Sequence, residues 1–171
     1  MRLSLLGLNK QEKNMSDLKK AQRMLWLFGF FKIPLIGFVR PKLLELTETR
    51  MVVRIKLKRK TKNHLGSMYF GSLAIGADLA GAFQSFYIAD KMKAKLSIVF
   101  KNFEASFLRR PESDVYFISD EGATIQAMVE ETMKTKERVT KDIKISAVTG
   151  YPNNSEVVSE FVLGLSVKDK S

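Results

Sequence analysis

Hydrophobic and polar residues alternate along the chain with two periods, which predict strands in some segments and helices in others. Period two, typical of strands with one buried face, marks six segments: residues 42–48, 51–60, 95–109, 114–119, 138–149 and 155–168. Residues 71–92 and 121–136 predict helices, and the first of these is apolar on every side, as buried helices are. This order predicts an α+β domain in which five or six mostly antiparallel strands wrap around one apolar helix.

The amino-terminal third contains an apolar run that is too short to span a membrane. Residues 24–39 read MLWLFGFFKIPLIGFV, and both Lys32 and Pro34 interrupt the run. We expect a helix that breaks or ends before Pro34 and lies on the body of the protein. Residues 1–14 are short and mixed, without the pattern of a secretory signal, and predict a disordered tail or an extension upstream of a natural start at Met15. A single cytoplasmic domain is expected over residues 15–171.

The positive charge is concentrated in the same third of the chain. Of the net charge of +11, residues 1–62 carry +12 (16 Lys and Arg against 4 Asp and Glu), and the remaining residues carry −1. Such a surface suits nucleic acid, lipid headgroups or a phosphorylated small molecule, or it is a solvated face without a partner. Because the aromatic residues follow core patterns and no nucleic-acid motif is present, we expect no specific nucleic-acid partner. A weak contact with a membrane surface stays open.

Composition removes several kinds of chemistry. The chain has no cysteine, which excludes disulfides, thiolate zinc sites and a cysteine nucleophile. Its one histidine, His64, excludes a centre built from several histidines. We therefore expect no metal and no resident cofactor.

Asp78 is the residue that fits its surroundings least well. Every neighbour between Leu73 and Phe83 is apolar or glycine, and a buried carboxylate is costly unless it is paired. Burial raises the pKa of such a group, which makes it a candidate general base or nucleophile. The alternative is a structural aspartate bonded to a backbone amide or to an arginine that faces it.

The loop before the apolar helix is the second candidate. Residues 63–71 read NHLGSMYFG and lead into the amino terminus of the helix, where free N–H groups could hold a carbonyl oxygen and the oxyanion it becomes. Asn63 could orient a water molecule or polarise a carbonyl. His64 is either an acid or base, or a histidine with a structural hydrogen bond.

This loop, together with the helix that carries Asp78 and Gly81, resembles the signature of hotdog-fold thioesterases. The resemblance is closest to the phenylacetate-degradation-type branch and its uncharacterised relatives, and in element order it covers residues 20–168. It implies a hotdog fold with an extra amino-terminal helix, and a homodimer with sheets joined side by side, often paired again into a tetramer. The informative motif itself is only about 20 residues long.

The resemblance also implies roles for individual residues. Asp78 matches the catalytic carboxylate of the family, and Phe70 and Gly71 match paired glycines whose amide binds the thioester oxygen. Asn63 and Gly66 match the upstream loop, in which the order of histidine and asparagine is reversed here. Tyr69 stands where the family usually has histidine, and Phe70 replaces the first glycine, which narrows or reshapes the acyl pocket.

Coenzyme A enters as part of the substrate. Besides Gly66, Ser67 and Tyr69 of the loop, the cations of residues 54–62 are candidates to hold its phosphates, above all Arg54, Lys58, Arg59 and Lys60. The alternative for these cations is a solvated strand face that discourages edge pairing.

These observations predict an acyl-CoA thioesterase in which Asp78 activates water or attacks directly. The loop amides would bind the thioester oxygen. The apolar residues between Met24 and Val39 would cover a sheet edge or lie along the substrate channel. Two alternatives remain: an acyl-CoA or fatty-acid binding protein without turnover, and an enoyl-thioester hydratase of the same fold that uses His64 and Asp78.

Overall fold

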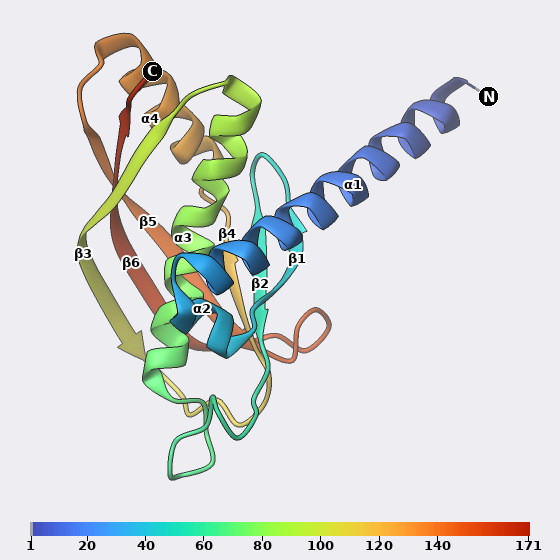
Figure 1. Ribbon diagram of the computed structural model, residues 1–171. Helices are drawn as coiled ribbons and strands as arrows, with labels where there is room; N and C mark the ends of the chain where they lie inside the picture. Colours follow the sequence, from blue (N-terminus) through green and yellow to red (C-terminus); the bar gives the residue numbers. More distant parts are fainter. Residues whose placement is uncertain (1) are drawn as a thin grey trace.

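The computed structural model describes residues 2–171, with side chains from residue 15 onward, and over these residues it forms four helices and one six-stranded sheet (Figure 1). The elements in chain order are α1 (Arg2–Phe31), α2 (Pro34–Val39), β1 (Lys42–Leu46), β2 (Met51–Ile55), α3 (Phe70–Met92), β3 (Leu96–Phe107), β4 (Val115–Ser119), α4 (Gly122–Thr135), β5 (Val139–Thr149) and β6 (Glu156–Asp169). A disordered tail or an upstream extension was predicted over residues 1–14; the backbone of residues 2–14 belongs to α1, and their side chains lie outside the described part of the chain.

The sheet is antiparallel throughout, in the order β1-β2-β4-β5-β6-β3. Its apolar rows face α3, and on β6 this row consists of Phe161, Leu163, Leu165 and Val167. The α+β class with a six-stranded antiparallel sheet is therefore confirmed. β3 forms one edge of the sheet, and pairs only with β6 among the described strands.

α3 lies against one face of the sheet (Figure 1). The small residues of α3 let its backbone approach the sheet closely. A Cβ atom at Gly76 would overlap the ring of Phe117 on β4. A Cβ atom at Gly81 would lie 3.1 Å from Ile145 and 3.2 Å from Leu163. The sheet-facing side of α3 is thus fixed by packing, while residues on its other side remain available for chemistry.

α1 and α2 form a hairpin that packs on α3 and β1. α1 ends at Phe31 and α2 begins at Pro34, as the sequence predicts, because proline has no N–H to continue a helix but suits a first turn. The two helices touch at a glycine pair, since a Cβ atom at Gly29 would lie only 2.8 Å from the nitrogen of Gly37. The Phe28 ring lies 6.2 Å from the Phe86 ring on α3, which anchors the hairpin there.

The strand predicted over residues 51–60 is shorter than expected. β2 ends at Ile55, because the Thr61 hydroxyl donates to the Lys56 carbonyl oxygen at 2.7 Å and accepts from the Lys58 N–H at 2.8 Å. These bonds hold residues 56–62 in turns. The prediction that residues 51–60 form one strand with cations along its solvated face is therefore wrong beyond Ile55. Arg54, which is partly buried, is the one cation on β2.

Candidate functional site

The loop before α3 is organised by the side chain of Asn63. Its amide oxygen accepts from the N–H groups of Leu65 at 2.9 Å and Ser67 at 3.2 Å, and its amide nitrogen donates to the Ser67 hydroxyl at 3.0 Å. Gly66 sits in this turn with φ of +82°, a conformation that favours glycine. Asn63, Gly66 and Ser67 thus shape the loop, and both ends of the Asn63 amide are already used within it.

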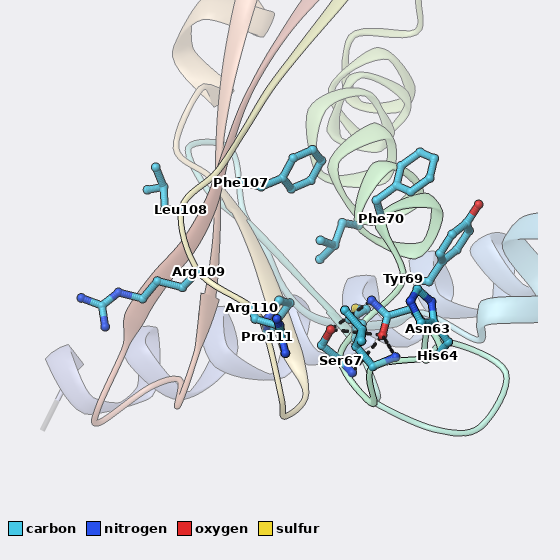
Figure 2. A pocket seen from close by; sticks show the side chains of 13 residues that line it. Asn63, His64, Ser67, Tyr69, Phe70, Phe107, Leu108, Arg109, Arg110 and Pro111 are labelled. Atoms are coloured by element: carbon cyan, nitrogen blue, oxygen red, sulfur yellow. Dashed lines mark hydrogen bonds between the residues drawn. The ribbon is translucent and has the colours of Figure 1, made fainter.

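This loop forms one wall of a cavity of about 470 Å³ at the amino terminus of α3, which we call the loop cavity. Asn63, His64, Ser67, Tyr69 and Phe70 line it from one side. The end of β3 and the residues after it line it from the other side, and Figure 2 shows Phe107 pointing toward the start of α3, where Phe70 lies. The structure therefore brings these five predicted residues together in one place.

The start of α3 combines free amides with two exposed aromatic rings. The first N–H groups of a helix have no partner within it, and here they belong to Phe70 and Gly71. The Tyr69 ring covers Gly71 so closely that a Cβ atom there would lie 2.6 Å from the ring. Tyr69 and Phe70 are both exposed, with ring centroids 4.7 Å apart. The aromatic residues at these two positions therefore reshape the surroundings of the amides.

Asp78 lies in a separate cavity of about 150 Å³, the Asp78 cavity. Its other lining residues are all apolar and come from three parts of the chain: the α1–α2 hairpin, α3 and β3 (Phe28, Ile33, Ile36, Leu79, Ala82, Phe83, Phe86, Ile98 and Phe100). Residues between Met24 and Val39 thus do line a cavity beside the predicted carboxylate.

The electrostatic state of Asp78 follows from these surroundings. Among the residues that the structure describes, no hydrogen bond or ion pair reaches its carboxylate. Desolvation by the apolar walls raises the pKa of the Asp78 carboxyl to about 6. The structure therefore lacks the backbone or arginine partner that a purely structural aspartate would need.

Asp78 and the helix start lie on the same chain but not within reach of one another. Phe70 and Asp78 are eight positions apart on α3, a rise of about 12 Å at 1.5 Å per residue. Hydrogen bonds to a shared substrate atom need heavy-atom distances near 3 Å. A carbonyl held at one chain's helix start is therefore out of reach of the same chain's Asp78.

The cations predicted to bind phosphate lie in a different part of the molecule from the loop cavity. Lys58 and Lys60 line a small cavity beside Val39 and Arg40 at the end of α2, and Arg59 is exposed in the turn next to them. The Arg54 Nε atom lies 3.9 Å from the Asp114 Oδ2 atom. None of these four residues lines the loop cavity.

Two other cations, which the sequence analysis missed, line the loop cavity. Arg109 and Arg110 come shortly after β3, which ends at Phe107. The Met68 N–H donates to the Pro111 carbonyl oxygen at 2.9 Å, which fastens this segment to the loop. Arg109 forms an ion pair with Glu156, whereas Arg110 is exposed and has no ion pair among the described residues. Their sequence signal was a pair of cations at the end of the strand predicted over residues 95–109, but the pattern did not indicate which loop they would meet.

The described part of the chain contains neither a cluster of metal-ligating side chains nor a helix that could span a membrane. Over those residues, no group of three or more His, Cys, Asp or Glu side chains could hold a metal ion. Likewise, none of the described helices is long and apolar enough to cross a membrane.

Comparison with solved structures shows the same fold in proteins of low sequence identity. A Shewanella oneidensis protein proposed to be a thioesterase superposes with a TM-score of 0.72 and 15% identity, covering 90% of this chain and 97% of its own. A Pseudomonas aeruginosa protein of unknown function, also proposed as a thioesterase, gives 0.73 and 18%, covering 88% and 95%. A thioesterase family protein from Silicibacter pomeroyi gives 0.64 and 13%, covering 89% and 98%. The chain therefore has the hotdog fold of these thioesterase-family proteins.

Sequence comparison identifies a family rather than an activity. No curated protein matches the chain in sequence. One family model, described as a domain of unknown function (DUF4442), matches residues 21–160. The chain belongs to this family.

Proposed function

We propose that the protein hydrolyses acyl thioesters, with Asp78 as the catalytic carboxylate. The observation that carries this proposal is the Asp78 cavity, where a carboxylate without a partner is enclosed by apolar walls. Leaving a carboxylate unpaired among apolar side chains costs stability, and such groups concentrate at functional sites. The similarity of the fold to thioesterase-family proteins supports the same reaction class.

In this proposal Asp78 acts as a general base or as a nucleophile. As a base it takes a proton from water, the hydroxide adds to the thioester carbonyl carbon, and the carbon–sulfur bond breaks to release the thiol and the acid. As a nucleophile its oxygen adds to the same carbon, and the carbon–sulfur bond breaks to release the thiol and leave an anhydride. Water then opens the anhydride, which releases the acid and restores the Asp78 carboxylate. The developing oxyanion is held by the amides of Phe70 or Gly71.

A complete site of this kind takes two chains. Because the amides and the carboxylate of one chain are about 12 Å apart along α3, we propose that Asp78 works with the helix start of a partner subunit. The surfaces that would meet are apolar: Val99, Phe100 and Phe103 on edge strand β3 are exposed, as is Phe70. A homodimer, or a pair of such dimers, joined along β3 would cover them.

We propose acyl-CoA as the substrate class, with Arg109 and Arg110 nearest to where its phosphates would enter. Both residues line the loop cavity, but the Arg109 side chain points away from the loop (Figure 2) and pairs with Glu156. The turn of residues 56–62 lies instead beside α2. Arg110, which has no ion pair among the described residues, is the better candidate of the two, since guanidinium groups bind phosphate with two parallel hydrogen bonds.

The test is hydrolysis of short, medium, long and aryl acyl-CoAs by the wild type, Asp78→Asn and Asp142→Asn. The aryl substrate probes the resemblance to the phenylacetate-degradation-type branch. Thiol release can be followed with a thiol reagent, because the protein has no cysteine. We expect Asp78→Asn to lose about two orders of magnitude in rate, while exposed Asp142→Asn on β5 retains wild-type rates. Turnover unchanged in Asp78→Asn would refute the assignment.

A second candidate, acyl-CoA or fatty-acid binding without turnover, is favoured by the Tyr69 ring over Gly71. It predicts no thiol release from any acyl-CoA and equal ligand affinity in the wild type and Asp78→Asn. The hydratase alternative has less support, because His64 and Asp78 line different cavities. His64→Ala would abolish a hydratase and only weaken a thioesterase.

A further inference from the structure

The outer side of the α1–α2 hairpin exposes an unusual amount of apolar surface. Trp26, Phe30 and Phe31 on α1 are 61%, 62% and 69% exposed, and Phe38 on α2 is also exposed. We call these four residues the aromatic patch. Trp26 stacks on Phe30 with ring centroids 5.7 Å apart, and Phe30 meets Phe31 edge to face at 4.8 Å. The patch is continuous on α1, and more exposed apolar residues adjoin it along the hairpin (Met24, Leu27, Ile33 and Leu35).

This exposure is not needed for folding of the hairpin. A different side of α1, which includes Ala21, Leu25 and partly buried Phe28, packs against the body of the protein. Large exposed apolar patches on proteins mark sites where another molecule binds. The aromatic patch is therefore an unfilled contact surface rather than a by-product of core packing.

Cations surround the patch without acidic residues among them. Residues 18–44 contain six Lys and Arg and no Asp or Glu. Lys19 and Arg23 are exposed one to two turns before the aromatic residues, and Lys32 is exposed directly after Phe31. The Lys60 ammonium lies 4.8 Å from the centroid of the Phe38 ring, which connects the cationic turn of residues 56–62 to the same surface.

A groove between the two helices adds a shaped opening beside the patch. It has a volume of about 650 Å³ and is lined by Trp26 and Phe30 on one side and by Pro34 and Gly37 on the other. Arg40, which follows α2, lines the same groove. Apolar walls and a cationic residue thus share one opening, the combination that an acyl chain and a phosphate headgroup would meet.

We propose that the aromatic patch and its cations dock the protein onto the surface of an anionic lipid bilayer. Helices that lie in a membrane interface combine Trp, Phe and Leu on one part of their surface with Lys and Arg beside it. Anionic lipid supplies the complementary charge. The described helices are not suited to cross the bilayer, so α1 and α2 lie in its interface. This proposal does not depend on the thioesterase proposal.

A second copy of the chain fits this surface less well. A two-fold contact places the same patch against itself, which would bring the Lys19, Arg23 and Lys32 cations of both copies together without acidic partners among residues 18–44. Like charges brought together at an interface oppose association. A lipid surface has the opposite sign of charge and favours binding.

Trp26 makes the proposal directly measurable, because it is the only tryptophan of the chain. The full-length protein is mixed at low salt with vesicles of phosphatidylglycerol and phosphatidylcholine, and separately with vesicles of phosphatidylcholine alone. We expect a blue shift of Trp26 emission and cosedimentation with the anionic vesicles, both reversed by high salt. Absence of cosedimentation at low salt, or equal binding to neutral vesicles, would overturn the proposal.

Variants separate the two parts of the surface. Lys19→Gln/Arg23→Gln/Lys32→Gln is expected to weaken vesicle binding on the order of 100-fold, since each cation near an anionic membrane contributes roughly 1 kcal/mol. Lys134→Gln/Lys141→Gln/Lys144→Gln removes the same charge from exposed positions on α4 and β5 and should bind almost as well as the wild type. Equal loss in both triple variants would overturn the proposal, because net charge alone would then explain binding.

The apolar part is tested with Phe30→Ser/Phe31→Ser, which keeps Trp26 and exchanges two exposed side chains. We expect this variant to fold, to lose about tenfold or more in vesicle binding, and to lose the emission shift. If sedimentation in solution instead shows a wild-type oligomer that this variant breaks apart, a second copy covers the patch and the lipid proposal fails.

Discussion

The loop of residues 63–69 and the middle of α3 differ in whether a polar side chain finds hydrogen-bond partners within the protein. In the loop, the Asn63 amide bonds to Leu65 and Ser67, so its hydrogen-bonding capacity is used internally. In the middle of α3, the Asp78 carboxylate has no such partner in the described residues and faces an apolar cavity. A polar group that is satisfied internally maintains structure, whereas one left unsatisfied at a cost is available to a ligand.

The largest expected effect is the pH dependence of hydrolysis. The proposed reaction needs the ionised carboxylate, and burial raises the pKa of Asp78 to about 6, so activity should rise with pH and level off above that value. Below it, kcat/KM should fall about tenfold per pH unit. A pH–rate profile of the wild type on its best acyl-CoA measures this. A profile flat down to the ordinary range of an aspartate would contradict the assigned environment.

The next largest effect is the loss of stability expected when the hydrogen bonds of the loop are removed. Asn63→Ala removes a side chain that makes four hydrogen bonds within the loop, two of them with the Ser67 hydroxyl, each worth about 1 kcal/mol net at most. We expect the free energy of unfolding to fall by about 2–3 kcal/mol, which lowers Tm by roughly 4–12 °C for a chain of this length. Thermal unfolding followed by circular dichroism gives the shift. An unchanged Tm with lost activity would instead make Asn63 a catalytic residue.

At Asp78 the opposite is expected, because removing the charge of its carboxylate should stabilise the folded protein at alkaline pH. Its folded pKa lies above the unfolded value, so the folded state binds the extra proton between the two values and loses stability as pH rises through about 6. The full shift corresponds to about 3 kcal/mol, and partial exposure reduces this to about 1–2 kcal/mol. Asp78→Asn should therefore raise Tm at alkaline pH and leave it unchanged near pH 4. Destabilisation at alkaline pH would show that the carboxylate has a structural partner.

The smallest effect concerns the cations. Arg110→Gln should raise KM for acyl-CoA severalfold, about 1 kcal/mol for one exposed phosphate contact, and leave kcat unchanged. KM for the corresponding acyl-pantetheine, which lacks phosphate, should not move. Arg59→Gln serves as the matched control, because Arg59 lies in the turn beside α2. If Arg59→Gln changes KM and Arg110→Gln does not, the phosphates bind at residues 54–60 instead.

Local patterns predicted the strands better than the site. The hairpin of β5 and β6 lies within one residue of the expected 138–149 and 155–168, because alternation along a strand is a local property. The end of β2 was wrong, since the Thr61 hydroxyl bonds to Lys56 and Lys58 in a turn that period two does not reveal. Asp78 stood out from its neighbours, but the hairpin residues that enclose it (Phe28, Ile33 and Ile36) lie 42 to 50 positions earlier in the chain. Arg109 and Arg110 were missed for the same reason.

The exposed edge of β3 makes the concentration of the protein a variable in its own right. Twelve residues of strand end the sheet there with apolar side chains exposed, and an edge of this kind pairs with another chain unless it is protected. If two chains pair along it, association stabilises the folded state by mass action, and Tm rises with protein concentration. Dilution would then separate the chains and lower the proposed thioesterase activity without altering any residue of the proposed site.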